Sequence, residues 1–273
     1  MKKMLREALK QVEDFDSVIV NTWDRPINKF CPINVFSFSE AESFYDKVIP
    51  DYIFESWEEC GIDDYRETIN EIKKVWEKKW LKKMIWWIWR FKTSKSRFKL
   101  AKLADKYPEY FDIKDSSNPD TKRLSHWDLV RNYDCLIDVE WRWYSWRTKL
   151  LFFSWRPLFI QERKWIDYAL KYAIPWKHYI LVKHDFSDLR EKFEEYLRNP
   201  EKFEKIWKAW QKFAEDKLTK ESALNEIKQS FTGLSFSSLN IVYILLFIFY
   251  RIICKIIEMF FLLIRRIREN IFE

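Results

Sequence analysis

Apolar and polar positions alternate most regularly between Tyr133 and Lys183. Three short apolar runs, 135–139, 157–160 and 179–182, are separated by segments long enough to form helices. Strands that are buried on both faces read as short continuous apolar runs, so this alternation predicts a strand, turn, helix, strand, helix, strand unit. We therefore expect this segment to belong to a parallel sheet in an α/β fold.

The same kind of patterning extends to both sides of this unit. The pattern predicts further strands at 17–20, 34–38, 49–54 and 84–87. It predicts helices over 3–13, over 66–79, from about residue 97, from Leu189 to Leu197 and over 201–217. Ser187 or Asp188 is the expected cap of the helix at Leu189, and Asn199-Pro200 is its expected end. The polar stretch 112–126 is predicted to link an N-terminal half, 1–115, to a C-terminal half, 116–232.

The remaining segment, 233–273, has a different pattern. It is continuously apolar from Ile241 to Tyr250, and the three charges that follow, at 251, 255 and 258, share one face of a helix. Each basic charge near the middle of a bilayer costs about 2.5–3.5 kcal/mol on insertion scales. The tail is therefore predicted to be an amphipathic helix at a membrane surface, and a terminal helix packed on the domain is the alternative.

Composition changes this picture in two ways. The chain has 273 residues, enough for a full core, but only 2 glycines, and it has 16 tryptophans. Average glycine usage of about 7% would give roughly 19. The four cysteines are scattered without ligand spacing, which indicates reduced thiols and a cytoplasmic protein. The N-terminus lacks the apolar core of a secretory signal.

The net charge is +7, but acidic and basic residues are interleaved, which is typical of a solvated surface and not of nucleic-acid binding. The stretch 81–104 is the exception, because it contains basic residues and no acidic ones. It could face a phosphate-bearing ligand or anionic lipid, and a merely basic surface is the alternative. Nucleic acid is not an expected partner, since no recognition motif accompanies this stretch.

Two loops follow predicted strands and carry polar side chains. Asp24 lies in the first, 21–26, and is a candidate acid or base, although it could equally cap a turn before Pro26. The second, 89–97, contains Ser94 and leads into a helix, which outlines a phosphate-binding arrangement. This second loop lacks the glycines that such an arrangement usually needs.

The order of motifs along the chain resembles glycosyltransferase family 90. The resemblance rests on Asn21-Thr22-x-Asp24-x-Pro26, Trp57, the 85–97 segment, Asp138-Val139-Glu140 followed by Tyr144-Ser145-x-Arg147, and motifs at 154–159, 175–179 and 185–189. It covers residues 15–200. The family includes bacterial lipopolysaccharide transferases, fungal capsule xylosyltransferases and animal protein O-glucosyltransferases.

This resemblance implies a GT-B-like architecture of two Rossmann-like halves with a UDP-sugar donor between them. It implies inverting transfer without a metal or other cofactor to lipopolysaccharide or another surface glycan. With the tail, it predicts a cytoplasmic protein held peripherally at the inner face of the membrane, next to a glycan or glycolipid acceptor. The alternative is a catalytically inactive homologue that acts as a membrane-associated binding or scaffold protein.

The resemblance also implies roles for individual residues. Asp24 corresponds to the general base that takes a proton from the acceptor hydroxyl. Arg147 is placed on the donor diphosphate, where a guanidinium offsets the charge of the leaving group. The other donor-binding candidates come from the same motifs: Ser94, Arg97, Glu140, Tyr144 and Ser145. His178 and Tyr179 are expected to shape the site, and a structural role is favoured for His178.

The departures from the family pattern involve tryptophan. Members carry glycine where this chain has Trp89, Trp141, Trp143, Trp146 and Trp155, whereas Trp57, Trp165 and Trp176 match family tryptophans. An indole at a turn that needs positive φ or close phosphate approach is physically unfavourable. We hypothesise that the gene comes from a source that reads UGA as glycine and that these codons are translated here as tryptophan.

Overall fold

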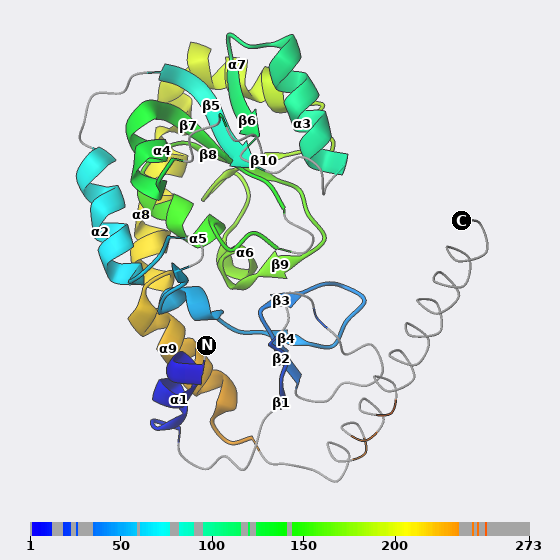
Figure 1. Cartoon of the computed structure of the whole chain (residues 1–273), viewed down its shortest axis with the longest axis vertical. Coiled ribbons are helices and arrows are strands. Elements are labelled where there is room, and N and C mark those ends of the chain that lie inside the picture. The colour runs from blue at the N-terminus through cyan, green and yellow to red at the C-terminus, as the bar shows by residue number, and fades with distance from the viewer. Residues whose placement is uncertain are drawn as a thin grey trace, which may run out of the picture.

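The computed structural model describes residues 2–12, 19–22, 26, 35–58, 61–76, 82–89, 95–115, 120, 124–140, 144–234, 242, 245 and 249. Within this part of the chain, the largest sheet has five parallel strands in the order β10-β8-β7-β5-β6. The strands are β5 (Lys82–Trp89), β6 (Phe111–Asp115), β7 (Tyr133–Asp138), β8 (Leu158–Gln161) and β10 (Ile180–Val182). Figure 1 shows them side by side in the upper part of the molecule.

Alternate residues of the central strands supply two cores. Cys135, Ile137 and Phe159 pack in the core that contains residues of α3 (Lys95–Lys106) and α7 (Leu189–Arg198). Leu136 and Ile160 belong to the other core, together with residues of α2 (Tyr65–Trp76), α4 (His126–Asn132) and α8 (Glu204–Lys217). Both faces of the sheet are therefore covered, which explains why all residues of β7 and β8 are buried and why these strands read as continuous apolar runs.

Two smaller sheets complete the strands that the structure describes. β1 (Ile19–Val20), β2 (Val35–Ser37) and β4 (Lys47–Val48) form a parallel three-stranded sheet. β3 (Ser39–Glu40) pairs antiparallel with β9 (Ile166–Asp167). The β3–β9 pair joins a segment near the N-terminus to the segment that follows β8.

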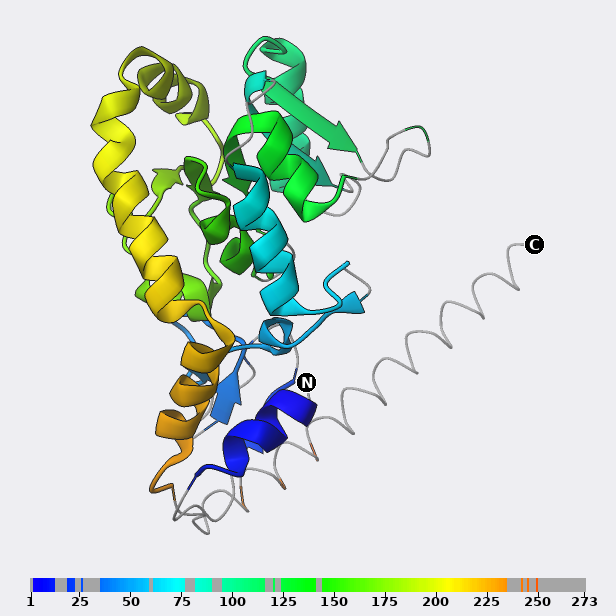
Figure 2. The ribbon, with the colours of Figure 1, turned by 90° about the vertical axis from the view of Figure 1, so that its left-hand side faces the viewer.

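Four further helices complete the helices of the described residues; two of them are short, and the first and last of the four along the chain contact each other. They are α1 (Lys2–Leu9), α5 (Thr148–Leu151), α6 (Tyr168–Tyr172) and α9 (Lys220–Phe231), with 3₁₀ turns η1 (Tyr52–Phe54), η4 (Phe152–Ser154) and η5 (Pro200–Phe203). Figure 2 shows α9 running from the end of α8 to α1. Glu55 forms ion pairs with Lys3 of α1 and Lys220 of α9, so the two ends of the described fold meet.

The prediction of a parallel α/β unit between 133 and 183 is confirmed, with α5 and α6 between its strands. The predicted strand at 49–54 is wrong: β4 ends at Val48, and Asp51 accepts a hydrogen bond from the Ile53 amide at 3.3 Å to start η1 instead. The apolar run there reflects complete burial of Ile53 and Phe54 in the core and not an extended backbone.

The predicted linker at 112–126 is partly wrong, since β6 occupies 111–115 at the edge of the five-stranded sheet. This sheet therefore takes strands from both sides of the boundary predicted at 115/116, and the division into halves stays a prediction. Asp188 precedes α7, but its carboxylate accepts from the Lys183 amide and does not cap the helix. α9 has no counterpart among the predicted elements, and most of the predicted tail helix lies outside the described residues.

Candidate functional site

The order of the five parallel strands locates one position at their carboxyl edge. Numbered along the chain, the strands lie in the order second, first, third, fourth, fifth, so the connections leave in opposite directions on either side of the β5–β7 pair. In such open sheets a crevice forms at this switch point, and ligands bind there. In this chain the switch point lies between the segment after β5, which leads into α3, and the segment after β7, which leads into α5.

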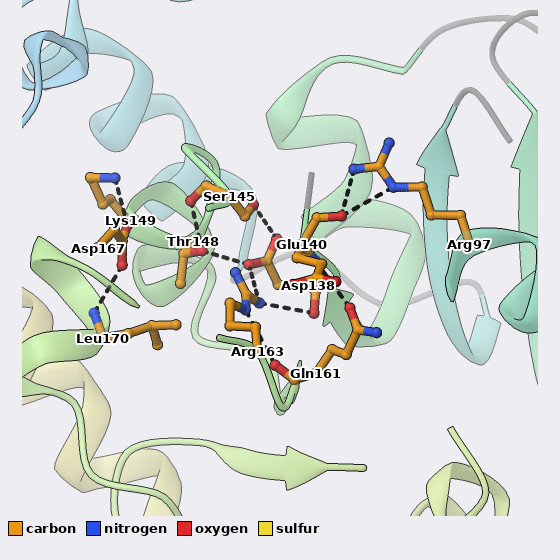
Figure 3. A network of polar contacts seen from close by, with 10 residues as sticks. All are labelled: Arg97, Asp138, Glu140, Ser145, Thr148, Lys149, Gln161, Arg163, Asp167 and Leu170. Atoms are coloured by element: carbon orange, nitrogen blue, oxygen red, sulfur yellow. Dashed lines mark hydrogen bonds and ion pairs between the residues drawn. The ribbon is translucent and has the colours of Figure 1, made fainter. Parts of the chain in front are cut away.

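Arg97 joins these two segments. It lies in the first turn of α3 and is fully buried, and its Nε and Nη2 atoms donate to the backbone carbonyl of Glu140 at 3.1 and 2.7 Å (Figure 3). The Glu140 amide in turn donates to Gln161 Oε1 at 3.1 Å, and Gln161 Nε2 donates to the His184 carbonyl at 2.8 Å. The backbone just beyond β7 is thus held by α3 on one side and by β8 on the other.

Asp138, the last residue of β7, organises the rest of this segment. It is completely buried, and it accepts hydrogen bonds from Ser145 Oγ at 2.7 Å and Thr148 Oγ1 at 2.5 Å. Arg163 Nη2 lies 3.0 Å from Asp138 Oδ2 and forms a buried ion pair with it. Figure 3 shows these side chains converging on the one carboxylate, which therefore fixes both the turn after β7 and the start of α5.

Three guanidinium groups gather at this edge: Arg97, Arg147 and Arg163, each at most 9% exposed. Burial, followed by repulsion from Arg147, lowers the pKa of Arg97 to about 7. Burial also raises the pKa of Glu140, although His184 and Arg163 offset part of that effect. Three guanidinium groups at the carboxyl edge of a parallel sheet attract anions, so the site is suited to a phosphate or diphosphate group.

Lys149 forms a second buried charge cluster on the other side of α5. Its ammonium group lies 2.7 Å from Asp167 Oδ2 and 3.0 Å from Asp51 Oδ2, and all three side chains are almost completely buried. Burial lowers the pKa of Lys149, but Asp167 and Asp51 outweigh this effect and raise it. Lys149 therefore stays charged in the interior.

Comparison with known proteins identifies the family. The family model described as Glycosyl transferase family 90 matches residues 1–228. The chain belongs to glycosyl transferase family 90. It is 26% identical over 240 residues to protein O-glucosyltransferase 1 of Rattus norvegicus, a match that covers 78% of this chain and 60% of the rat protein.

Two further relatives in this family show the same level of similarity. Protein O-glucosyltransferase 2 of Danio rerio is 28% identical over 224 residues, covering 74% of this chain and 44% of the relative. Protein O-glucosyltransferase 1 of Homo sapiens is 27% identical over 218 residues, covering 70% and 54%. The chain thus spans about half the length of the curated relatives that it matches.

With the family known, the predicted site residues fall into two groups. The structure brings Arg97, Glu140, Ser145 and Arg147 together around the switch point, and Tyr144 is buried there with Lys149 5.2 Å from its ring centre. Asp24 and Ser94 lie outside the described residues. The backbone next to the Asp24 loop is described: Asn21 follows β1 and donates to Ser37 Oγ at 2.9 Å, at the carboxyl end of the three-stranded sheet.

His178 has the surroundings of a structural residue. Its ring stacks on Phe213 with centroids 4.7 Å apart, and its Nδ1 accepts a hydrogen bond from the Ile174 amide at 3.0 Å. Burial and the neighbouring charge of Lys177 lower its pKa. Because Nδ1 is occupied as an acceptor, the neutral imidazole is the form that fits this packing. Tyr179, the next residue, is buried and directly precedes β10.

Two of the anomalous tryptophans have described side chains. Trp155 adopts φ 54° and ψ 24°, the left-handed conformation that favours glycine. Trp146 packs its indole against Trp57 and His126, with ring centroids 5.2 and 5.7 Å away. Trp176, which matches a family tryptophan, also has positive φ, at 62°. The left-handed backbone therefore agrees with a glycine position at 155 but does not distinguish it from 176.

Sequence reasoning missed the residues that hold the site in place. Asp138 belongs to a family motif but carries no predicted role, although a carboxylate that ends a buried strand is itself a signal. Gln161 ends β8 in the same way, and Arg163 lies two residues beyond it. Lys149 and Asp167 carry no such signal, since nothing local distinguishes a buried charge from an exposed one.

No group of three or more His, Cys, Asp or Glu side chains within the described ranges is arranged to hold a metal ion. No helix in that part of the chain is both long and apolar enough to cross a membrane. Metal independence and peripheral membrane binding remain expectations.

Proposed function

We propose that this chain transfers a sugar from a nucleotide diphosphate donor, a UDP-sugar, to an acceptor hydroxyl. The observation that carries the proposal is the group of buried arginines at the β5–β7 switch point, in a chain that belongs to glycosyl transferase family 90. A donor diphosphate is the kind of anion that a group of guanidinium side chains binds. Bidentate hydrogen bonds from arginine to phosphate oxygens are strong and directional.

Each residue then has a chemical task. Arg147 binds the diphosphate and offsets the charge that develops on it as the bond to the sugar breaks. Arg97 and the backbone of Glu140 hold the two segments of the switch point together, and Ser94, Tyr144 and Ser145 complete the donor site. Asp24 takes the proton of the acceptor hydroxyl as its oxygen attacks the anomeric carbon from the opposite side, which inverts the configuration.

The GT-B-like arrangement follows from the same proposal. Two parallel sheets, of three and five strands, each end in polar segments at their carboxyl edges. In a GT-B arrangement the Asp24 segment, which follows β1, faces the donor site, which follows β5 and β7. The acceptor lies between them.

We infer that the acceptor is lipopolysaccharide or another surface glycan and that the protein acts in the cytoplasm at the inner face of the membrane. Support comes from the sequence of the tail, 233–273, where apolar residues are followed by arginines. The relatives are named protein O-glucosyltransferases, so a protein hydroxyl is the competing acceptor. An acceptor screen with radiolabelled UDP-sugars, comparing lipopolysaccharide fractions with folded protein domains, separates the two.

The binding experiment is isothermal titration calorimetry of the full chain with UDP. Arg147→Ala is expected to weaken UDP binding by about a hundredfold, because it removes a charge-assisted bidentate contact. The matched control is Arg66→Ala, whose exposed side chain pairs with Glu221 on the surface and is expected to leave binding unchanged. Equal affinities for wild type and Arg147→Ala would contradict the donor site.

The transfer experiment uses Asp24→Asn. This variant is expected to bind UDP normally and to lose sugar transfer, since an amide cannot accept the acceptor proton. A variant that still transfers sugar at the wild-type rate would rule Asp24 out as the base. A wild-type chain that binds UDP but transfers no sugar would favour the alternative of an inactive binding protein.

We further propose that Trp89, Trp141, Trp143, Trp146 and Trp155 are glycine in the native protein, because UGA is read as glycine in its source. Support comes from the left-handed backbone of Trp155 and from the shortage of glycine. The codons at these five positions test the proposal directly, and any UGG among them contradicts it there. Restoring the five glycines is expected to strengthen UDP binding, because indoles near the phosphates are removed.

A further inference from the structure

Lys149 is a buried cation that takes no direct part in the proposed transfer reaction. Its side chain is fully buried, and its ammonium group is paired with Asp167 and Asp51 at 2.7 and 3.0 Å. A lysine can satisfy its packing with its aliphatic stem and keep its charge in water, so complete burial of the charge needs an explanation.

The two acidic partners belong to different parts of the fold. Asp167 ends β9, and its other oxygen, Oδ1, accepts from the Leu170 amide at 3.0 Å to cap α6. Asp51 lies in the N-terminal part of the chain, where its Oδ1 accepts from the Ile53 amide at the start of η1. Each carboxylate is thus held in place by a backbone amide as well as by Lys149. The ammonium group therefore connects α5 to both η1 and α6.

The same lysine lies next to the proposed donor site. Lys149 is in α5, two residues after Arg147, and its ammonium group lies 5.2 Å from the ring centre of Tyr144. Thr148, between them, binds Asp138 on the opposite side. The segment 144–151 is therefore held from one side by the Asp138 cluster and from the other by the Lys149 cluster (Figure 3).

We propose that Lys149 is a positioning residue: by pairing with Asp167 and Asp51 it fixes segment 144–151, and Arg147 with it, relative to η1 and α6. A buried ion pair adds little net stability, but it specifies one arrangement, because any displacement leaves a charge without its partner. A donor diphosphate then meets a preformed guanidinium and pays no ordering cost on binding. This inference rests on the proposed donor site for its consequence in binding.

The test uses the double variant Lys149→Met/Asp167→Asn in the full chain. It removes Lys149 and one of its two acids together and keeps similar side-chain volumes. The remaining acid, Asp51, is buried and burial already raises its pKa, so without Lys149 it is expected to hold a proton and leave no unpaired buried charge. The folded double variant, checked by circular dichroism, is expected to bind UDP about tenfold more weakly than wild type. Wild-type affinity in the folded double variant overturns the inference.

Hydrogen exchange tests the positioning role of Lys149 without using UDP binding. Backbone amides of Leu150 and Leu151 donate to the Arg147 carbonyl at 3.0 and 3.1 Å. Their hydrogen exchange is expected to be about tenfold faster in the double variant, since local opening no longer breaks the ion pairs. If wild type fails to bind UDP, the donor proposal fails, and unchanged exchange in the double variant is then what overturns the positioning role.

Arg156→Met is the matched control. Arg156 is equally buried and donates from Nε and Nη2 to the Val130 carbonyl at 2.9 and 2.8 Å, just before β8 and so at the opposite end of that strand from Gln161. It is expected to lower stability while leaving UDP affinity and the exchange of 150 and 151 within about twofold of wild type. Equal changes in both variants mean that Lys149 acts through general stability, which contradicts a positioning role.

The two acids provide a finer test. Lys149 Nζ lies 2.7 Å from Asp167 Oδ2, to which it donates a hydrogen bond, and 3.0 Å from Asp51 Oδ2, so its contact with Asp167 is the shorter one. Asp167→Asn is therefore expected to weaken UDP binding more than Asp51→Asn does, by about threefold or more. The reverse order contradicts the geometry assigned to the cluster.

Discussion

Two buried charge clusters flank the same short helix, α5, and they are assembled in different ways. The cluster around Asp138 takes its members from a single β-α-β unit, between residues 138 and 163. The cluster around Lys149 takes Asp51 from the N-terminal part of the chain and Asp167 from β9. The first organises a loop within one sheet, and the second relates that loop to other parts of the fold.

The two clusters also differ in how completely their charges are balanced. Asp138 and Arg163 are one acid and one base, and two hydroxyl groups donate further hydrogen bonds to the carboxylate. Lys149 faces two acids, so this cluster holds one acid in excess, and Asp51 makes the longer of the two contacts. A balanced cluster is expected to be sensitive to the loss of any member, whereas an unbalanced one is expected to tolerate the loss of its excess acid.

The largest expected effect is in the balanced cluster. Asp138→Asn is expected to lower the free energy of unfolding by about 3–5 kcal/mol, because Arg163 is left as an uncompensated buried cation. Urea denaturation followed by circular dichroism measures this. The control, Asp138→Asn/Arg163→Met, is expected to regain a large part of the loss, and a double variant no more stable than Asp138→Asn would show that the ion pair is not the cause.

The hydroxyl partners of Asp138 have a smaller expected effect. Ser145→Ala and Thr148→Val should each lower the free energy of unfolding by about 1–2 kcal/mol, since each removes one buried hydrogen bond to a charged group. The two losses are expected to be non-additive with Asp138→Asn, because all three changes disturb one network. Strict additivity in the double-mutant cycles would mean that the hydroxyl groups act independently of the carboxylate.

The second cluster holds one acid more than it holds bases, and Asp51 is expected to make the stability of the protein depend on pH. Burial raises the pKa of Asp51 above its ordinary value of 3.8, while Lys149 offsets part of the effect. The folded state then holds this proton to higher pH than the unfolded state does, so the contribution of Asp51 to stability falls as pH rises from about 3.8 through the raised pKa. Asp51→Asn removes this dependence.

Relative to wild type, the Asp51→Asn variant is therefore expected to become more stable as the pH rises from about 3.5 to about 7. Denaturation curves of both proteins at the two pH values give the comparison. A difference that stays constant with pH, or that grows in favour of wild type as the pH rises, would show that Asp51 is not the acid that holds its proton.

The smallest expected effect lies outside both clusters, at Trp155. Trp155→Gly and Trp155→Ala both remove the indole, including its contact with Lys73, so their difference reports the backbone alone. With φ at 54°, glycine is expected to be the more stable of the two by about 0.5–1 kcal/mol. The same pair at Phe98, an exposed residue within α3, is expected to favour alanine.

Much of the five-stranded sheet could be predicted from local patterns. Strands β7, β8 and β10 are short apolar runs separated by helix-length segments, and this combination of length and order identifies them. The strand predicted at 49–54 is wrong because Asp51 starts a 3₁₀ turn there. An apolar run of this length indicates burial but does not specify the backbone conformation. Strand β6 was not predicted, because an edge strand that contains Asp112 and Lys114 has the composition of a polar linker.

The sequence by itself determined the parallel α/β unit, the motifs that identify the family, and the choice of Arg97, Glu140, Ser145 and Arg147 as one group. These properties are encoded over short distances along the chain, in periodicity and in residue order. Only the tertiary structure decided that β5 lies between β6 and β7, which creates the switch point where Arg97 reaches Glu140. It also decided that Asp51 meets Lys149, because pairing between distant segments depends on strand order and packing, which local patterns do not encode.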